Sequence, residues 1–310
     1  MPAAHSTTRY VGRFAPSPSG PLHFGSLLAA VGSYLDARSH DGAWLLRMED
    51  VDRPRCSAEA AESILRTLAA FGFEWDGEVM LQSPRDPAYR AAFEMLREGG
   101  RIFPCGCTRR EIADSRPPAG SSLAGDGAQI YPGTCRSGLG PGRPERSWRL
   151  RVDADVTVFD DAVQGEIRQD LGGEVGDFVL LRADGLFAYQ LAVVADDAAQ
   201  GITHVVRGAD LLDSTPRQIL LQRLLGMPTP CYAHLPVAVN AAGEKLSKQT
   251  RAVALDARRP VPALLSALEF LGQMPPGELA QASLTELWRW ARVHWDLERV
   301  PRQRVLATPG

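Results

Sequence analysis

The sequence predicts an α/β protein built on a parallel β-sheet, with a second lobe inserted into it and a short helical segment after it. Residues 9–14 have the pattern of a short strand, and a turn rich in proline and glycine separates them from an amphipathic helix within 26–39. The apolar run 42–50 has strand length, and residues 57–73 form a second amphipathic helix that Gly72 stops. Strand, turn, helix, strand and helix in this order begin a parallel sheet.

The pattern changes between about residues 103 and 182. Stretches rich in glycine, proline and serine alternate there with strand-like pieces at 147–160 and 165–171. This predicts an inserted α+β or β-rich lobe. Alternation of strands and helices returns after Asp184 and runs to a loop at 243–249.

The rest of the chain has the pattern of helices. Trp288, Trp290 and Trp295 fall on one predicted helical segment as a mixed stripe. Such a stripe is more typical of helix packing than of a platform on which nucleic-acid bases stack.

The composition is that of an ordinary globular enzyme. The chain has 310 residues, 45% apolar and 23% charged, and a core of this size needs no disulfides. A net charge of −3 gives no overall basic field, so a nucleic-acid partner would have to use a local patch. The N-terminus has no apolar secretory stretch, the apolar runs are too short for a bilayer, and the cysteines number five. We therefore expect a cytoplasmic protein with reduced thiols and no membrane partner.

Residues 15–28, APSPSGPLHFGSLL, combine a strand end, a tight turn and the start of a helix. A helix N-terminus favours phosphate because its N–H groups and its dipole present positive potential. His23 can donate a hydrogen bond to a phosphate oxygen, and Gly25 leaves room for an adenine ring against the backbone. The alternative is a tight turn capped by Ser26 with a surface histidine, and the turn alone favours that alternative.

The loop 243–249, GEKLSKQ, contains both lysines of the chain, Lys245 and Lys248, whereas the other 32 basic side chains are arginine. An ammonium group is a compact charge on a flexible stem, and a guanidinium group is a planar fork. The clustering indicates a site that needs the ammonium. Codon bias with chance clustering is the alternative.

Cys105, Cys107 and Cys135 have the spacing of a metal site. Two thiols one residue apart and a third beyond a loop supply three ligands of a tetrahedral zinc site. Spacing alone leaves the fourth ligand open, and three cysteines without a metal remain the alternative. Cys56 and Cys231 lie in unrelated contexts and are expected to be small buried hydrophobic residues.

Two of these motifs together resemble the paired signatures of class I aminoacyl-tRNA synthetases. PSGPLHFGS is similar to the HIGH signature, with Phe24 and Ser26 in place of its second and fourth members. KLSKQ is similar to the KMSKS signature, with Leu246 and Gln249 as replacements. The flanking segments RFAPSPSGPLHFG, LLRMEDVDRPR and THVVRGADLLDSTPRQILLQRLLG narrow the resemblance to the glutamyl branch. It covers roughly residues 9–260 and implies a Rossmann-like catalytic domain.

The resemblance implies a reaction that joins an amino-acid carboxylate to the α-phosphate of ATP and releases pyrophosphate. Negative charge gathers on the triphosphate, and point charges on a mobile loop can follow it. Lys248 is therefore assigned the main phosphate role and Lys245 a supporting one, and the implied catalytic residues are these two lysines and His23. The implied ATP site consists of His23, Gly25, Ser26 and Lys248. Mg²⁺ is expected with ATP, without an identifiable protein ligand.

The same resemblance implies a pocket for glutamate, whose two carboxylates and one ammonium suit two guanidinium forks and one acid. Arg13 is assigned to the side-chain carboxylate and Glu49 to the amine, with surface ion pairs as the alternative. The implied pocket consists of Arg13, Ala15, Ser17, Glu49, Tyr189 and Arg207. The neighbouring acids are expected to serve turns or structure, namely Asp50, Asp52, Asp196 and Asp197.

The family carries C-x-C followed by Y-x-x-x-C as its zinc pattern, which implies Tyr131 as the fourth ligand. One structural zinc is expected, because the inserted lobe lies away from both signature motifs. The predicted division has a catalytic domain in two halves, 1–103 and 186–257. An acceptor-binding-like lobe with the zinc site spans 104–185, and a C-terminal helical segment without an anticodon-binding domain spans 258–310.

Only 61 residues follow Gln249, too few for the helical domains that read an anticodon in a full glutamyl-tRNA synthetase. In this respect, and in the forms HFGS and KLSKQ, the chain resembles the glutamyl-queuosine tRNA(Asp) synthetases. The resemblance implies that ATP activates L-glutamate without tRNA, and that glutamate is then transferred to queuosine in the anticodon loop of tRNA(Asp). Two alternatives remain: a short glutamyl-tRNA synthetase that charges a tRNA 3′ end, and a non-catalytic paralogue that binds tRNA or another partner. Nothing in the sequence demands more than a monomer.

Overall fold

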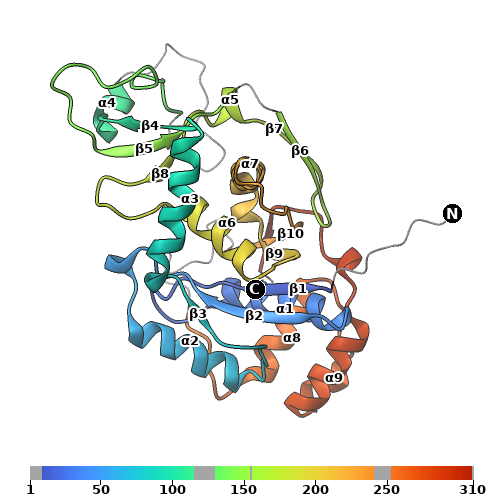
Figure 1. Cartoon of the computed structure of the whole chain (residues 1–310). Helices are drawn as coiled ribbons and strands as arrows, with labels where there is room; N and C mark the ends of the chain where they lie inside the picture. Colours follow the sequence, from blue (N-terminus) through green and yellow to red (C-terminus); the bar gives the residue numbers. More distant parts are fainter. Residues whose placement is uncertain (1–8, 115–129, 154–155, 241–252, 309–310) are drawn as a thin grey trace.

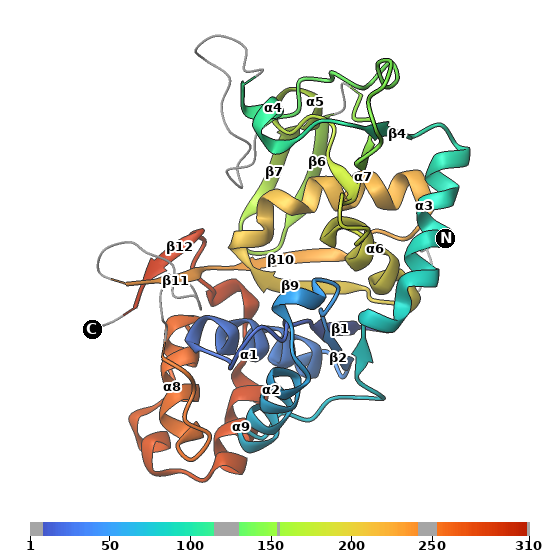
Figure 2. The same cartoon turned by 90° about the vertical axis from the view of Figure 1, so that its left-hand side faces the viewer.

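The structure is a computed structural model that describes residues 9–114, 130–153, 156–240 and 253–308. A central layer of mostly parallel strands lies between a small antiparallel lobe at one end and a group of helices at the other (Figure 1, Figure 2). Within the described ranges no helix is both long enough and apolar enough to cross a membrane.

The first half of the central layer is a parallel sheet in the order β1–β2–β3. Its strands are β1 (Val11–Phe14), β2 (Ala43–Met48) and β3 (Met80–Leu81). α1 (Phe24–Ser39) connects β1 to β2, and α2 (Ala58–Ala70) follows β2. The predicted order of strand, turn, helix, strand and helix is confirmed.

Local residues fix both ends of α2. Ser57 caps its start by accepting a hydrogen bond from the backbone N–H of Ala60 at 3.1 Å. Gly72 follows its end with φ of +76°, a conformation that a residue with a Cβ rarely adopts. The sequence-predicted stop at Gly72 is therefore confirmed.

The second half of the layer has the strand order β7–β6–β10–β9. Its strands are β6 (Val156–Asp161), β7 (Gly165–Asp170), β9 (His204–Gly208) and β10 (Cys231–Leu235). β9 and β10 are parallel, while β6 and β7 form an antiparallel hairpin that joins β10 through the pair Asp161 and Tyr232. The hairpin belongs to the segment expected as an inserted lobe, yet it extends the sheet of the catalytic half.

The two halves of the layer are contiguous. The backbone N–H of Thr203, just before β9, donates to the carbonyl oxygen of Val11 in β1 at 2.9 Å. α1 packs against both β1 and β9 and so covers this junction. On the other side, α3 (Asp86–Glu98) packs against α6 (Tyr189–Ala199) and α7 (Thr215–Leu225). The carboxyl ends of β1, β2 and β9 consequently meet near the start of α1.

The small lobe is an antiparallel sheet in the order β4–β5–β8 (Figure 1). Its strands are β4 (Ile102–Cys105), β5 (Ser147–Leu150) and β8 (Val179–Leu181). Two short helices accompany it, α4 (Arg109–Asp114) and α5 (Leu171–Glu174). Figure 2 shows this lobe at the end of the molecule opposite to the C-terminal helices.

The C-terminal segment contains α8 (Pro260–Phe270) and α9 (Leu284–His294), as the sequence predicts. It also contains β12 (Val305–Ala307), which pairs in parallel with β11 (Val237–Val239). The expectation of a wholly helical segment is therefore wrong. Three apolar residues are too few to show a period, and β12 forms because β11 offers it an open edge.

The tryptophans of the C-terminal segment pack in the core, as predicted. Trp288 and Trp295 are each 8% exposed. The indole N–H of Trp288 donates to the carbonyl oxygen of Phe71 at 2.8 Å, and that of Trp295 donates to Asp36 at 3.2 Å. Trp290 is partly buried against the same core.

Candidate active site

One cavity of about 750 Å³ opens where the carboxyl ends of β1, β9 and β10 meet the start of α1. Phe14, Gly208 and Leu235, the last residues of these strands, line it. The cavity also brings together all the predicted glutamate and ATP residues that the structure describes: Arg13, Ala15, Ser17, His23, Gly25, Ser26, Glu49, Tyr189 and Arg207. Residues from both halves of the predicted catalytic domain, which are far apart in the sequence, thus line the same cavity.

His23 is the capping residue of α1. Its Nδ1 accepts a hydrogen bond from the backbone N–H of Ser26 at 3.3 Å. Because an accepting Nδ1 leaves the hydrogen of a neutral imidazole on Nε2, the ring offers a donor on its other side. The alternative of a turn capped by Ser26 is therefore wrong, and the helix N-terminus at the cavity favours an anion.

A buried acid holds the guanidinium of Arg13. The Nε of Arg13 donates to Oδ1 of Asp197 at 3.2 Å, and the same oxygen accepts from Nη2 of Arg47 at 2.6 Å. Burial alone would raise the pKa of Asp197, but Arg13 and Arg47 outweigh it and hold that pKa below its ordinary value. Asp197 therefore stays ionised at neutral pH and orients Arg13 at the cavity.

Glu49 is an acid in the cavity wall whose side chain is 10% exposed and whose Oε1 is buried. It directly follows β2, and its backbone N–H donates to the carbonyl oxygen of Pro16 at 3.0 Å. This hydrogen bond joins the loops that follow β1 and β2. Its Oε1 lies 3.6 Å from Nη2 of Arg47 and has no hydrogen-bond partner within the described ranges. Burial raises the pKa of Glu49 above its ordinary value, although Arg47 and Arg13 oppose the shift. A buried oxygen without a donor is suited to receive one from a ligand.

Arg207, on β9, is the second guanidinium of the cavity. Its Nη2 donates to Oγ1 of Thr215 and Oε1 of Gln218, each at 2.8 Å. Its Nε donates to Nε2 of His234 at 3.0 Å, and its Nη1 to the hydroxyl of Tyr189 at 3.4 Å. Burial, followed by the charge of Glu49, raises the pKa of Tyr189 to about 12, so its hydroxyl stays protonated at neutral pH.

Sequence reasoning missed the residues that hold Arg207 in place. Thr215 and Gln218 lie on α7, and His234 lies on β10 beside Arg207. The sequence offered no clear signal, because α7 carries several other polar residues and a polar residue such as His234 occurs in many cores without a functional role.

Two of the acids predicted to be structural, Asp196 and Asp50, hold neighbouring segments together. Asp196 accepts hydrogen bonds from the hydroxyl of Tyr89 at 2.8 Å and from Nε2 of Gln82 at 2.7 Å. Asp50 accepts one from the backbone N–H of Ser83 at 2.8 Å. These carboxylates fix the connections between the strands rather than facing the cavity.

The chain enters and leaves the lysine-bearing segment beside the cavity. β11, which lines the cavity, leads into residues 241–252. On the far side of that segment, Ala254 pairs with His23 in an antiparallel bridge. Lys245 and Lys248 themselves lie outside the described residues.

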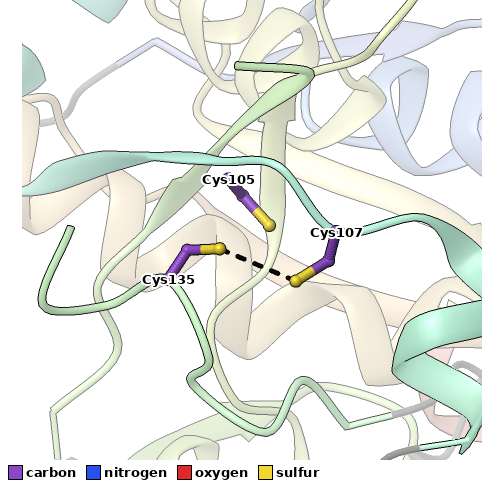
Figure 3. Close-up of side chains that lie close together, drawn as sticks. All are labelled: Cys105, Cys107 and Cys135. Carbon is purple, nitrogen blue, oxygen red and sulfur yellow. Dashed lines mark hydrogen bonds between the residues drawn. The ribbon is translucent and has the colours of Figure 1, made fainter. Parts of the chain in front are cut away.

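Three cysteines of the lobe form a possible metal site. The sulfur atoms of Cys105, Cys107 and Cys135 lie within 4.8 Å of one another, and Figure 3 shows the side chains converging. The sulfur atoms of Cys107 and Cys135 are 3.6 Å apart. The hydroxyl of Tyr131 lies 3.4 Å from the sulfur of Cys105 and 3.6 Å from that of Cys107. The predicted ligands therefore share one centre and can hold a metal ion.

Arg149 adds a positive charge to this cluster. Its guanidinium carbon lies 4.0 Å from the centre of the Tyr131 ring, and its Nε donates to the sulfur of Cys105 at 3.4 Å. Burial raises the pKa of Cys105, but hydrogen bonds from Tyr131, the backbone of Cys107 and Arg149 outweigh it and lower that pKa to about 7. The thiolate form, which binds metals, is thereby favoured.

The remaining cysteines differ from expectation. Cys231 is exposed and Cys56 is half-buried, so the expectation that both are buried is wrong. Cys231 is the first residue of β10 and is exposed at the rim of the sheet, whereas the four residues that follow it in the strand are all buried.

The fold is that of a class I aminoacyl-tRNA synthetase. The crystal structure of glutamate-tRNA synthetase from Elizabethkingia anophelis superposes with a TM-score of 0.77 over 95% of this chain and 67% of that chain. The two sequences are 24% identical, so this likeness concerns the fold alone.

Sequence comparison identifies the family of this chain more closely than the fold does. The family described as "tRNA synthetases class I (E and Q), catalytic domain" matches residues 10–278. The proteins named glutamyl-Q tRNA(Asp) synthetase from Aromatoleum aromaticum and Dechloromonas aromatica are 62% and 61% identical to this chain over 97% of its length. The match covers 93% and 99% of their own lengths, respectively. The chain therefore belongs to the class I tRNA synthetases of the glutamyl and glutaminyl branch, and within them to the glutamyl-Q tRNA(Asp) synthetases. The resemblance predicted from the signature motifs is confirmed.

Proposed function

We propose that this chain activates L-glutamate with ATP to glutamyl-adenylate without tRNA, and then transfers the glutamyl group to queuosine in the anticodon loop of tRNA(Asp). The observation that carries the proposal is the single cavity in which two guanidinium groups, an acid and a helix N-terminus line the same space. Two cations and one acid complement the charges of glutamate, and the helix N-terminus complements a phosphate. The names of the relatives support the queuosine acceptor.

In this proposal three of the charged residues that line the cavity, Arg13, Glu49 and Arg207, bind glutamate. Glu49 receives the ammonium group, because its Oε1 is buried and has no hydrogen-bond donor in the described ranges. Arg13 binds the side-chain carboxylate while Asp197 keeps it in place. Arg207 supplies the second guanidinium beside the hydroxyl of Tyr189, and Ala15 and Ser17 line the same wall.

The first chemical step is an in-line displacement on ATP. An oxygen of the α-carboxylate attacks the α-phosphorus, the bond to the bridging oxygen breaks, and pyrophosphate leaves. The Nε2–H of His23 and the start of α1, including Gly25 and Ser26, hold phosphate oxygens. Mg²⁺ accompanies the ATP and neutralises part of its charge.

Lys248 is proposed to stabilise the charge that develops on the leaving pyrophosphate, with Lys245 in support. Ala254, which is bridged to His23, is the sixth residue after Lys248. A chain of that length reaches up to about 20 Å. This chain length is compatible with contact between Lys248 and the phosphates.

In the second step a hydroxyl of the queuosine cis-diol attacks the carbonyl carbon of the adenylate. The carbonyl–oxygen bond to phosphate breaks, AMP leaves and the hydroxyl loses its proton. A second cavity of about 570 Å³ shares Arg55 with the first and is also lined by Arg109 and Arg182. Asp52, which is 3.2 Å from Nη1 of Arg182, is its acidic member. These three arginines support the approach of an RNA backbone beside the glutamate site.

Two measurements test the proposed function. Glutamate-dependent exchange of pyrophosphate into ATP without tRNA is expected, and its absence would favour a non-catalytic paralogue. The ester is then mapped on tRNA(Asp) that contains or lacks queuosine. We expect glutamate on the queuosine-containing tRNA alone, at the modified base. An ester on the 3′ adenosine would instead indicate a short glutamyl-tRNA synthetase.

Changing Lys248 to arginine is expected to lower kcat for pyrophosphate exchange at least tenfold, because a planar fork cannot follow the moving charge as a compact ammonium does. Changing Lys245 to arginine is the matched control and should have a smaller effect. Steady-state exchange kinetics at saturating glutamate and ATP measure both. An unimpaired Lys248→Arg enzyme would contradict the role of ammonium geometry.

We also propose that Cys105, Cys107, Cys135 and Tyr131 bind one structural zinc. Zinc–sulfur bonds of about 2.3 Å in a tetrahedron place sulfur atoms roughly 3.8 Å apart, and a phenol oxygen at about 2.0 Å would lie roughly 3.5 Å from each sulfur. The separation of 3.6 Å between Cys107 and Cys135, and the sulfur–oxygen distances of 3.4 and 3.6 Å, fit such a centre. Bound zinc would tie the loop that carries Cys135 to β4.

Protein purified without chelators is expected to contain one zinc per chain by elemental analysis. Cys105→Ser and Cys135→Ser should each lose most of it, because each removes one of three thiolates. Cys231→Ser is the matched control, since Cys231 is exposed and lies outside the cluster. A wild-type protein without zinc would exclude the site.

We propose the same division of the chain that the sequence predicts. Residues 1–103 and 186–257 form the catalytic domain, and 258–310 form the C-terminal segment. Residues 104–185 form the acceptor-binding-like lobe, except that their hairpin β6–β7 joins the catalytic sheet. The cavity shared by β1, β9 and β10 and the separate β4–β5–β8 sheet support this division (Figure 2). We propose that the protein acts as a monomer in the cytoplasm, where ATP and tRNA are found.

A further inference from the structure

We infer that Asp161 and His234 are positioning residues for Arg207, and that they act through the tautomer of the His234 ring. Neither side chain lines the cavity; both are 0% exposed behind it. The inference rests on the proposed role of Arg207 in binding glutamate. It adds two residues, one from the hairpin of the predicted inserted lobe, to the machinery that selects the amino acid.

The three side chains form one line of hydrogen bonds. Arg207 and His234 are direct neighbours on the parallel strands β9 and β10, and Nε of Arg207 lies 3.0 Å from Nε2 of His234. The Nδ1 of His234 lies 2.6 Å from Oδ2 of Asp161, at the end of β6. The imidazole therefore bridges the carboxylate and the guanidinium.

Only one tautomer of His234 is compatible with these hydrogen bonds. An arginine Nε can only donate, so Nε2 of His234 must accept. Burial lowers the pKa of His234 to about 4 despite its hydrogen bond to Asp161, so the ring carries one hydrogen at neutral pH. That hydrogen lies on Nδ1 and is donated to Asp161. The Oγ1 of Thr215, 3.1 Å from Nε2, can donate to the same acceptor.

Asp161 is itself held in one orientation. Its Oδ1 accepts from the backbone N–H groups of Val163 at 3.1 Å, Gln164 at 2.8 Å and His234 at 3.0 Å. This leaves Oδ2 to accept from the imidazole. Burial would raise the pKa of Asp161, but its hydrogen bonds from the His234 ring and from the backbone of Gln164 and His234 hold that pKa below its ordinary value.

Asp161→Asn is the sharpest perturbation of this line. The amide oxygen of asparagine is expected to keep the three backbone hydrogen bonds, which turns its NH₂ group towards Nδ1 of His234. Nδ1 must then accept, so the ring hydrogen moves to Nε2 and faces the N–H of Arg207. Two donors now oppose each other, and Arg207 is displaced from the cavity wall.

We expect Asp161→Asn to raise the KM for glutamate about tenfold or more in pyrophosphate exchange, with the KM for ATP changed less than about twofold. In a His234→Met background, where no ring can change its tautomer, the same change should add less than about twofold. Asp36→Asn is the matched control: it is an equally buried carboxylate that accepts from Tyr10 and Trp295 far from the cavity, and it should leave the KM for glutamate unchanged. Equal effects of Asp161→Asn in both backgrounds would overturn the inference.

The tautomer is also measurable without any activity. In ¹⁵N-histidine-labelled protein, two-bond ¹H–¹⁵N correlations distinguish a hydrogen on Nδ1 from one on Nε2, and His234→Met identifies the signal by its absence. The wild type should show the Nδ1–H form and Asp161→Asn the Nε2–H form. An Nε2–H wild type would overturn the inference. A wild type that lacks glutamate-dependent exchange would instead refute the proposed function and leave the tautomer result standing.

Discussion

Replacing Glu49 with glutamine is expected to lower kcat/KM for glutamate by about thirtyfold to several thousandfold in pyrophosphate exchange, mainly through a higher KM. The buried Oε1 of Glu49 is the proposed partner of the substrate ammonium. Removing one member of a buried, hydrogen-bonded charge pair typically costs about 2–5 kcal/mol, and each 1.4 kcal/mol is a factor of ten. The amide would also turn a donor towards either the ammonium or Arg47.

The same role of Glu49 gives a pH dependence. The ammonium needs the ionised carboxylate, and burial raises the pKa of Glu49. The KM for glutamate should therefore rise as the pH falls, beginning at a higher pH than an exposed glutamate would cause, and Glu49→Gln should remove this dependence. Glu62→Gln, in an exposed pair with Arg66, is the control that should match the wild type. A wild-type KM independent of pH would speak against the assignment.

Replacing Asp197 with asparagine is expected to lower the free energy of unfolding by about 3–5 kcal/mol. Asp197 lies between Arg13 and Arg47, whose side chains are 4% and 0% exposed, and the neutral amide leaves both guanidinium groups short of a counter-charge. Urea unfolding at neutral pH measures the loss. The glutamate KM should rise as well, because Arg13 loses the carboxylate that orients it.

The sign of the pH effect on stability follows from the lowered pKa of Asp197. A carboxylate with a folded-state pKa below its unfolded value of about 3.9 contributes its full stabilisation above about pH 4, and loses it as the pH falls through the folded-state pKa. The difference between wild type and Asp197→Asn should therefore be constant at neutral pH and shrink in acid. Asp153→Asn, in a surface pair with Arg136, should cost less than about 1 kcal/mol. An equal loss of unfolding free energy in Asp197→Asn and Asp153→Asn would contradict the stabilising role of the buried contacts of Asp197 with Arg13 and Arg47.

Much of the site follows from local sequence. The strand, turn and helix at residues 9–39 are each predicted by their own residues, so the sequence alone places His23 at the N-terminus of a helix. Arg13 and Glu49 end neighbouring parallel strands, and such ends meet at one edge of a sheet. The signature motifs then link these residues to Arg207, which lies far along the chain.

Other features depend on contacts that no local pattern records. The partnership of Asp161 with His234 joins a hairpin turn to a strand 73 residues later, and neither position differs in pattern from an ordinary core polar residue. The exposure of Cys231 depends on where β10 begins. The pairing of β12 with β11 depends on an edge that exists only in the folded molecule.

The parallel pair of β11 and β12 has a consequence for how the protein matures on the ribosome. Val237 and Ala238 in β11 line the cavity that we propose binds ATP, yet their partners are Val305 and Leu306. During synthesis the early strands can assemble long before those partners have emerged. That wall of the cavity gains its pairing strand only when residue 307 has left the exit tunnel, so nascent chains stalled earlier should be unable to bind ATP tightly.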